Sequence, residues 1–245
     1  REGFSDTFTL QTPVADTQID MGTEQQASDE IKKIALEFGA GLVGITNYDN
    51  RWEYSRKFSD MSATSRPAEI PDTLNNVIVI AQPMDYELVR TVPSALSGSA
   101  TGLGYSHDAL TVLSLTQYIR NLGYEAIGSM NDTSLAIPYA IKAGLGEYGR
   151  HGLLITPKYG PRIRLGKVYT NLPLAHDRPI RFGVKEFCEI CRRCTKGCPV
   201  KAIPDGPPSK DTYNQSNIHG VSKWSVDGEK CFGFWAAQNT DCSIC

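Results

Sequence analysis

The chain has 245 residues, of which 40% are hydrophobic and 21% are charged, a balance typical of a globular protein with a sizeable core. Its formal net charge of -2 and its pI of about 6.1 provide no extended basic surface, so a nucleic-acid partner is not expected. No segment approaches the roughly 20 consecutive apolar residues that a membrane-spanning helix needs.

The N-terminal part of the chain begins with a polar arm and continues into helices and strands. Residues 1–27 show no hydrophobic period and are expected to form a peripheral arm. Ser28 can cap an amphipathic helix that Gly39 ends. The apolar runs at 41–46 and 75–83 predict buried strands, with a polar stretch between them.

Small residues precede the next helix. Residues 94–104 are rich in Ser, Ala and Gly and predict a loop that leads to Tyr105. The amphipathic helix that starts at Tyr105 is expected to end at Gly123. A short strand over 125–129 and a helix over 134–143 follow.

Glycines then divide the chain before two more strands. The segment 144–152 resembles a nucleotide-binding loop only weakly, because it follows a helix, so it is expected to end that helix or to allow close approach of the backbone to a cofactor. Strands are predicted over 152–157 and 162–171. Alternating helices and strands favour an α/β arrangement up to about residue 180, where cysteines and polar loops begin.

All seven cysteines lie after residue 187, and this crowding predicts a metal centre rather than a disulfide framework. Four of them form the run C-x2-C-x2-C-x3-C-P, the spacing used by ferredoxins that hold two 4Fe-4S clusters. In such proteins three cysteines of the run bind one cluster and the fourth binds the other. The run consists of Cys188, Cys191, Cys194 and Cys198.

A second and less regular set of cysteines follows. Cys231, Cys242 and Cys245 are expected to bind one cluster together with Cys198. The first three cysteines of the run would bind the other cluster, whose fourth ligand is expected about four residues after Cys245. Because the chain also starts with Arg rather than Met, we expect it to be a piece of a longer protein, truncated at both ends. Two zinc sites are the alternative, although zinc ribbons usually separate their C-x2-C pairs by a longer loop.

Three further segments, together with the cysteine run, carry a resemblance to a known family. They are GLGYSHDAL, MNDTSLAIPYAIKAGLGEYGRHGLLITPKYGPRIRLGKVYTNLPL and VDGEKCFGFW. In this order they resemble the corrinoid-dependent reductive dehalogenases, particularly the chloroethene-reducing type, over about residues 30–245. The resemblance implies a mixed α+β or α/β fold, in which a nitroreductase-like corrinoid and substrate domain over 28–180 precedes a ferredoxin-like module with two 4Fe-4S clusters over 181–245.

The resemblance also implies an active site. Tyr105 matches the tyrosine that the family places above cobalt as the proton donor, and Asn131 and Arg164 match the polar pair beside it. Thr101 and Trp235 match positions that line the substrate pocket. Without the resemblance, a tyrosine at the start of a helix would be read as a packing residue and an arginine in a strand as a surface charge.

The implied reaction replaces the halogen of an organohalide by hydrogen. Reduced cobalt, fed by low-potential clusters, would remove the halogen, and the substrate would then need a proton. Tyrosine ionises near pH 10, and a nearby arginine favours the anionic form, so we expect Arg164 to make Tyr105 a better acid. Asn131 could hydrogen-bond the phenolic oxygen or the departing halide. The sequence has no D-x-H-x-x-G motif, the pattern of corrinoid sites in which a protein histidine binds cobalt. A base-off corrinoid without a histidine ligand is therefore expected.

Two other functions compete with this one. Epoxyqueuosine reductases share the corrinoid and two-cluster plan, but they resemble the chain mainly around the cysteines, use an acidic proton donor and need a basic surface for tRNA. A non-catalytic ferredoxin-type electron carrier would need only the cysteine-containing segment and would leave the preceding α/β region unexplained.

The resemblance implies partners and a location as well. We expect a small organohalide substrate, a chlorinated ethene, and electrons from the quinone pool or a redox partner in anaerobic respiration. A small hydrophobic membrane-anchor protein is expected to hold the enzyme on the outer face of the cytoplasmic membrane. Export would use a twin-arginine signal that this sequence does not include.

Overall fold

The computed structural model describes residues 13–59, 63–67, 70–131 and 133–245. Its contacts divide the chain into two compact units that interleave along the sequence. Unit 1 consists of Arg1–Pro83, Gly104–Leu145 and Ile163–Pro179, and unit 2 of Met84–Leu103, Gly146–Arg162 and Ile180–Cys245.

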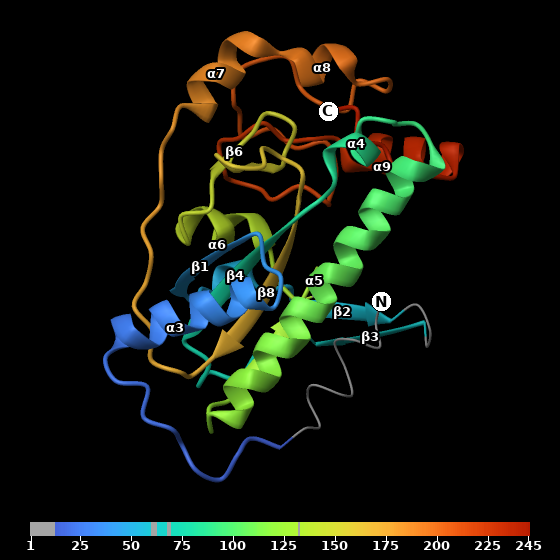
Figure 1. The fold of residues 1–245 in the computed structure, drawn as a ribbon. Coiled ribbons are helices and arrows are strands. Elements are labelled where there is room, and N and C mark those ends of the chain that lie inside the picture. The colour runs from blue at the N-terminus through green and yellow to red at the C-terminus, as the bar shows by residue number, and fades with distance from the viewer. Residues whose placement is uncertain (1–12, 60–62, 68–69, 132) are drawn as a thin grey trace. The chain divides into compact units, whose positions relative to one another are not determined.

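Unit 1 is built on a four-stranded antiparallel sheet, of which β1, β4 and β8 are labelled in Figure 1. In β4 every residue except the last is buried, which explains why its sequence is a continuous apolar run rather than an alternating one. Because neighbouring strands cover both edges of β4, all its backbone groups can be paired within the sheet. The strand order is β1 (Leu42–Asn47), β4 (Asn76–Pro83), β8 (Ile163–Thr170) and β5 (Ala126–Ser129).

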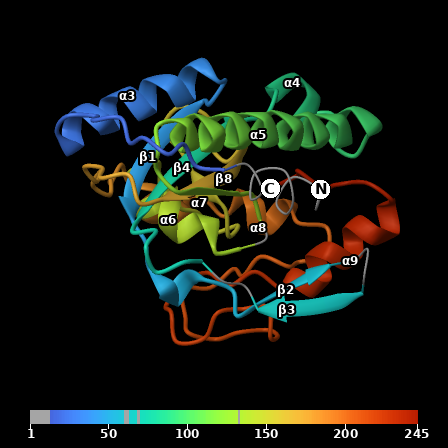
Figure 2. The same cartoon turned by 90° about the horizontal axis from the view of Figure 1, so that it is seen from below.

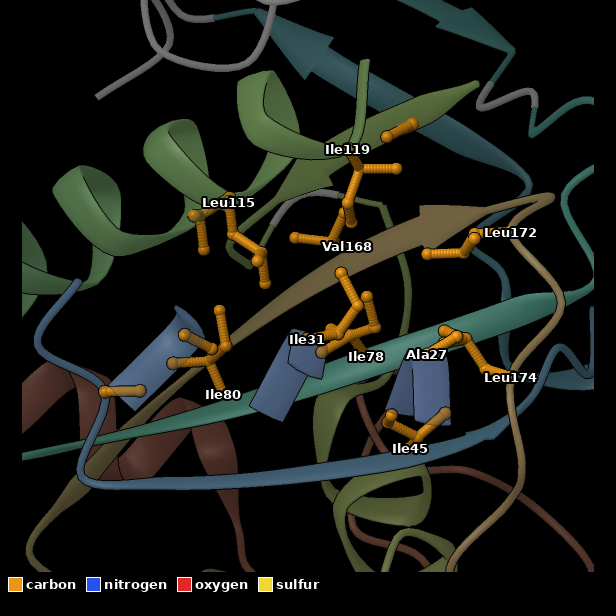
Figure 3. Close-up of a cluster of buried hydrophobic side chains, with 14 residues drawn as sticks. Ala27, Ile31, Ile45, Ile78, Ile80, Leu115, Ile119, Val168, Leu172 and Leu174 are labelled. Carbon is orange, nitrogen blue, oxygen red and sulfur yellow. The ribbon is translucent and has the colours of Figure 1, made fainter. Parts of the chain in front are cut away.

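The main core of unit 1 lies between one face of this sheet and two helices, α3 (Glu24–Glu37) and α5 (Ala95–Asn121). Figure 2 shows both helices on the same side of the sheet. Figure 3 shows the side chains that meet there, which are almost all aliphatic and include Ile31 from α3, Ile78 from β4 and Leu115 from α5. All three of these side chains are 0% exposed, so their burial accounts for much of the stability of this layer.

The short helix α6 (Ala136–Lys142) packs on the opposite face of the sheet. A Cβ atom at Gly44 of β1 would lie 2.2 Å from the carbonyl oxygen of Ala143, so only glycine allows this close approach. Tyr139 of α6 is fully buried, and its ring centroid lies 6.3 Å from that of Tyr169 of β8 in an edge-to-face arrangement.

The remaining elements are short. In unit 1 they are η1 (Asn50–Trp52) and the paired strands β2 (Arg56–Ser59) and β3 (Thr64–Pro67). In unit 2 they are α4 (Tyr86–Val89), β6 (Glu147–Tyr148), β7 (Leu154–Ile155), α7 (Val184–Cys191), α8 (Arg193–Gly197) and α9 (Gly228–Gln238). Among the described residues, no helix combines the length and the apolar character needed to cross a membrane.

Three expectations from the sequence need correction. The first helix begins at Glu24 rather than after Ser28, because Thr23 and Gln26 form a capping box there. Residues 95–104 are helical and extend α5 toward its N-terminus, although their small residues predict a loop. The strand expected over 152–157 is reduced to β7, which pairs with β6. The arm predicted over 1–27 falls partly outside the described residues.

Candidate active site and cysteine pocket

Three polar side chains that were predicted to act together meet in unit 1. Tyr105 lies on α5, Arg164 on β8 and Asn131 shortly after β5. The side-chain amide of Asn131 donates a hydrogen bond of 2.8 Å to the Tyr105 hydroxyl. The Arg164 guanidinium carbon lies 4.5 Å from the centroid of the Tyr105 ring, and its Nη1 atom lies 3.5 Å from the phenolic oxygen. At these distances the stacking on the ring outweighs the long hydrogen bond. An amide and a cation therefore hold the phenol in place.

A buried carboxyl group that the sequence did not single out lies one helical turn after Tyr105. Asp108 is 1% exposed, and its Oδ1 atom has no hydrogen-bond partner in the part of the chain that the structure describes. Burial raises the pKa of Asp108 to about 7, and the positive charges of Lys167 and Arg164 oppose this rise. The sequence shows that Asp108 follows Tyr105 by three residues, a spacing that places both on one side of a helix. The sequence does not show that Asp108 is buried, because its burial depends on contacts in the folded chain.

The two residues predicted to line the substrate pocket lie in unit 2. Thr101 is 5% exposed on α5. Trp235 lies on α9, and its indole Nε1 atom is buried without a hydrogen-bond partner among the residues described. The structure thus assigns both residues to a different unit from Tyr105, and their contact with substrate stays a prediction.

Four thiols line one pocket in unit 2. The pocket has an empty volume of about 420 Å³, which includes some open solvent. Across the described ranges, no three His, Cys, Asp or Glu side chains form a site for a single metal ion. The four thiols line a pocket instead. The remaining lining is mainly apolar and includes Val200, Ile203, Phe234 and Ile244. The four thiols belong to Cys198, Cys231, Cys242 and Cys245, the set predicted to bind one cluster.

Burial and repulsion from neighbouring thiols raise the pKa values of two cysteines in this pocket, Cys245 and Cys231. Burial raises the pKa of Cys245 to about 12, and the neighbouring Cys231, Cys242 and Cys194 add to the rise. The pKa of Cys231 is raised by burial first and then by Cys242 and Cys198. Thiols crowded in this way ionise when a metal centre supplies the compensating charge.

A buried arginine stabilises the backbone around the cysteine run. Arg150 is 1% exposed, and its guanidinium donates hydrogen bonds to the carbonyl oxygens of Cys188, Pro204 and Gly206 at 3.0, 2.9 and 2.7 Å. Its guanidinium carbon also lies 4.6 Å from the centroid of the Trp224 ring. Arg150 thus links the cysteine run to the loop that follows it.

A second pocket adjoins the cysteine pocket and opens to solvent, with an empty volume of about 780 Å³. The turn between β6 and β7 and the helix α9 supply much of its lining. The two pockets share His151, Val226, Cys231 and Trp235. Cys231 and Trp235 lie four residues apart on α9, so one face of this helix contributes to both pockets.

Three of the four histidines make local contacts within their own unit. Burial lowers the pKa of His151 to about 4, so this side chain is neutral at neutral pH, and its Nδ1 atom accepts a hydrogen bond of 3.1 Å from the backbone N–H of Leu153. His176 Nε2 lies 2.7 Å from Asn76 Oδ1, and His219 Nδ1 lies 3.3 Å from a threonine hydroxyl. The expected lack of a histidine ligand to the corrinoid stays a prediction.

Comparison with known proteins identifies the class to which this architecture belongs. The family model for reductive dehalogenase subunits matches residues 62–174. The chain belongs to the reductive dehalogenase family. Among its relatives, the tetrachloroethene reductive dehalogenase of Desulfitobacterium hafniense is 37% identical over an alignment 262 positions long, which covers 91% of this chain and 47% of the relative. The chain therefore spans about half the length of the curated relatives that it matches.

Solved structures support the same assignment. The catabolic reductive dehalogenase NpRdhA, solved in complex with 3-bromo-4-hydroxybenzoic acid, aligns with a TM-score of 0.82 and 26% identity over 95% of this chain and 33% of that chain. Epoxyqueuosine reductase from Streptococcus thermophilus aligns less well, with a TM-score of 0.53 and 19% identity over 85% of this chain and 57% of that chain. The latter likeness shows a shared fold only. The predicted mixed α/β content and the predicted family are confirmed.

Proposed function

We propose that this chain is part of an enzyme that replaces a halogen of a small organohalide, a chlorinated ethene, by hydrogen. The observation that carries the proposal is the phenol of Tyr105, fixed by the Asn131 amide and the Arg164 guanidinium. Reductive loss of a halogen leaves a carbon atom that must gain a proton, and a positioned phenol is a suitable donor. The names of the relatives favour a chlorinated ethene as the substrate.

Each of the three polar side chains has a separate role in this proposal. The Tyr105 hydroxyl gives its proton to the substrate carbon. Arg164 stabilises the negative charge that remains on the phenolic oxygen, because its cation stacks on the same ring. Asn131 fixes the direction of the hydroxyl through its hydrogen bond. Thr101 and Trp235 are proposed to line the pocket, where an aromatic wall suits an apolar haloalkene.

The cysteine pocket fits an iron–sulfur cluster. Its four thiols line a mainly apolar space, and no three His, Cys, Asp or Glu side chains within the described residues form a site for a single metal ion. We assign Cys198, Cys231, Cys242 and Cys245 to one 4Fe-4S cluster and the first three cysteines of the run to a second. Such clusters supply low-potential electrons when bound.

The open pocket that adjoins the cysteine pocket is a suitable place for part of a corrinoid. Its lining includes Tyr148, Leu153 and Phe232, whose rings and methyl groups suit contact with a flat macrocycle. A corrinoid held there would supply a reduced cobalt centre, the chemistry needed to break a carbon–halogen bond. We propose a base-off corrinoid without a histidine ligand, and splitting from a histidine nitrogen in the Co(II) electron paramagnetic resonance spectrum would contradict this.

The test uses the full-length protein, produced anaerobically with corrinoid and iron and supplied with a chemical reductant. We expect chloride release from tetrachloroethene or trichloroethene. Tyr105→Phe should lose chloride release but keep its corrinoid, iron and sulfide, whereas the exposed control Tyr213→Phe should behave as the wild type. Wild-type protein that holds all its cofactors but releases no halide from any chlorinated ethene would refute the proposed function.

We also propose that the enzyme works on the outer face of the cytoplasmic membrane, with a small hydrophobic anchor protein, and takes its electrons from the quinone pool. Support for this comes from the family resemblance. Fractionation of cells that produce the full-length protein tests it, since the enzyme should accompany the membrane only when the anchor protein is also produced.

A further inference from the structure

The elements that hold Tyr105 also bury three polar atoms that the mechanism above does not use. These atoms are Gln82 Oε1 on β4, Asp108 Oδ1 on α5 and Arg164 Nε on β8, and none has a hydrogen-bond partner within the described part of the chain. Gln82 and Arg164 are directly paired in the register of β4 and β8. Buried polar atoms without partners are uncommon in native proteins, so three of them in one layer require an explanation.

Asp108 lies close to the strand that carries Arg164. A Cβ atom at Gly166 would lie 2.5 Å from Asp108 Oδ1, so the carboxyl group contacts the backbone of β8 where a side chain is missing. Arg164 and Gly166 are two residues apart on β8 and therefore face the same side of the sheet. Arg164 in turn stacks on Tyr105, which lies three residues before Asp108 on α5. One face of α5 and one face of β8 thus bring the acid, the cation and the phenol together.

We propose that Asp108 is a positioning residue whose proton controls the charge that Arg164 presents to Tyr105. This inference rests on the proposed function and deepens it. While Asp108 is protonated, the full charge of Arg164 acts on the phenol and stabilises the phenolate that proton donation leaves behind. When Asp108 loses its proton, its negative charge offsets Arg164, and the phenol becomes a poorer donor. No electron moves in this step, and the proton of Asp108 is exchanged with solvent.

The surroundings of Asp108 favour the neutral acid. Its carboxyl group is buried, which raises its pKa to about 7, and its Oδ1 atom has no hydrogen-bond partner among the described residues. The charged groups that act on it are Arg164 and Lys167, both from β8, while Gln82 of β4 is uncharged. On its own helix the titratable neighbours are Tyr105 and the exposed His107. The proton of Asp108 is therefore lost close to neutral pH.

The first measurement is the pH dependence of kcat/KM for chloride release by the full-length holoenzyme. The wild-type value should fall as the pH rises through about 7. Asp108→Asn keeps the shape of the neutral acid but cannot ionise, so this fall should disappear, and at pH 8.5 the variant should exceed the wild type by roughly tenfold. The control His107→Gln should keep the wild-type profile, because it changes an exposed neighbour on the same helix and leaves Asp108 in place. An Asp108→Asn variant that keeps the fall, or loses activity at every pH, would overturn the proposal.

The second measurement does not depend on turnover. Isotope-edited infrared spectra of tyrosine-labelled holoenzyme report the C–O stretch of Tyr105, identified by its loss in Tyr105→Phe. We expect this band to shift with a midpoint near pH 7 in the wild type, together with loss of a protonated carboxylic acid band, and both changes should be absent in Asp108→Asn. If the bands behave in this way in an enzyme that releases no chloride, the proposed function fails while the coupling stands. If the Tyr105 band does not respond near neutral pH, the coupling is wrong whatever the activity.

Discussion

Replacing Arg150 with methionine removes a buried guanidinium and keeps a flexible apolar side chain of similar length. Three carbonyl oxygens, those of Cys188, Pro204 and Gly206, would lose the hydrogen bond from Arg150, although Pro204 keeps one from Thr195 and Gly206 keeps one from Trp224. An acceptor left without its donor costs roughly 1 kcal/mol at the low end and each of the other two lost bonds roughly 0.5 kcal/mol, which gives about 2 kcal/mol. We therefore expect the segment over 184–206 to open more readily.

Hydrogen–deuterium exchange of the holoenzyme measures this opening directly. A loss of about 2 kcal/mol corresponds to roughly thirtyfold faster exchange in peptides from 184–206, since each 1.4 kcal/mol is about a factor of ten. Arg150→Lys keeps the charge but has fewer donors, so an intermediate increase is expected. Exchange rates in Arg150→Met equal to those of the wild type would refute the idea that these hydrogen bonds stabilise the cysteine run.

Three further predictions concern stability and cofactor content. Gly44→Ala would place a methyl group 2.2 Å from the Ala143 carbonyl oxygen, so we expect a loss of about 3 kcal/mol and a lower urea midpoint, and an unchanged midpoint would contradict this packing. Because the pKa of Asp108 is about 7 in the folded chain and near 4 when unfolded, its contribution to stability falls as the pH rises from about 4 to 7. Three pKa units correspond to about 4 kcal/mol, so Asp108→Asn should raise the melting temperature more at pH 8 than at pH 5, and an equal effect at both would count against the raised pKa. Cys231→Ala removes a thiol from the cysteine pocket, so iron and sulfide per chain should fall to about half, and full content would show that this cysteine is not a ligand.

The sequence was most informative where one residue type or one period determines the outcome. The apolar run of β4 predicts a buried strand, because a strand covered on both faces needs no polar alternation. The cysteine run, together with the crossover rule of two-cluster ferredoxins, predicts that Cys198, Cys231, Cys242 and Cys245 share one cluster. These four residues line one pocket, and their binding of a cluster stays a prediction.

Where tertiary contacts override local preference, the sequence was misleading. Residues 95–104 contain small residues and glycines that weaken a helix, yet they form the start of α5. Ser97, Ala100 and Thr101 are almost fully buried there, so packing that the sequence does not reveal stabilises the helix. Ser28 could have capped α3, but its hydroxyl is used in a bond with the backbone of Ala175, which is remote in sequence.

The candidate site shows the same division. A motif match is enough to nominate Tyr105, Asn131 and Arg164, and the structure brings all three into contact. Asp108 could not be found in this way, because only the fold shows that this aspartate is buried and that its Oδ1 atom has no hydrogen-bond partner among the residues described. The raised pKa of Asp108 results from its burial in the folded chain, which the residue type alone does not predict.

The position of Cys231 and Trp235 on one turn of α9 restricts how this protein can evolve. A mutation that rotates or shifts that turn to admit a different molecule into the open pocket would also displace a thiol of the cysteine pocket. New specificities should therefore arise from changes on other walls, while this turn of α9 accumulates few substitutions.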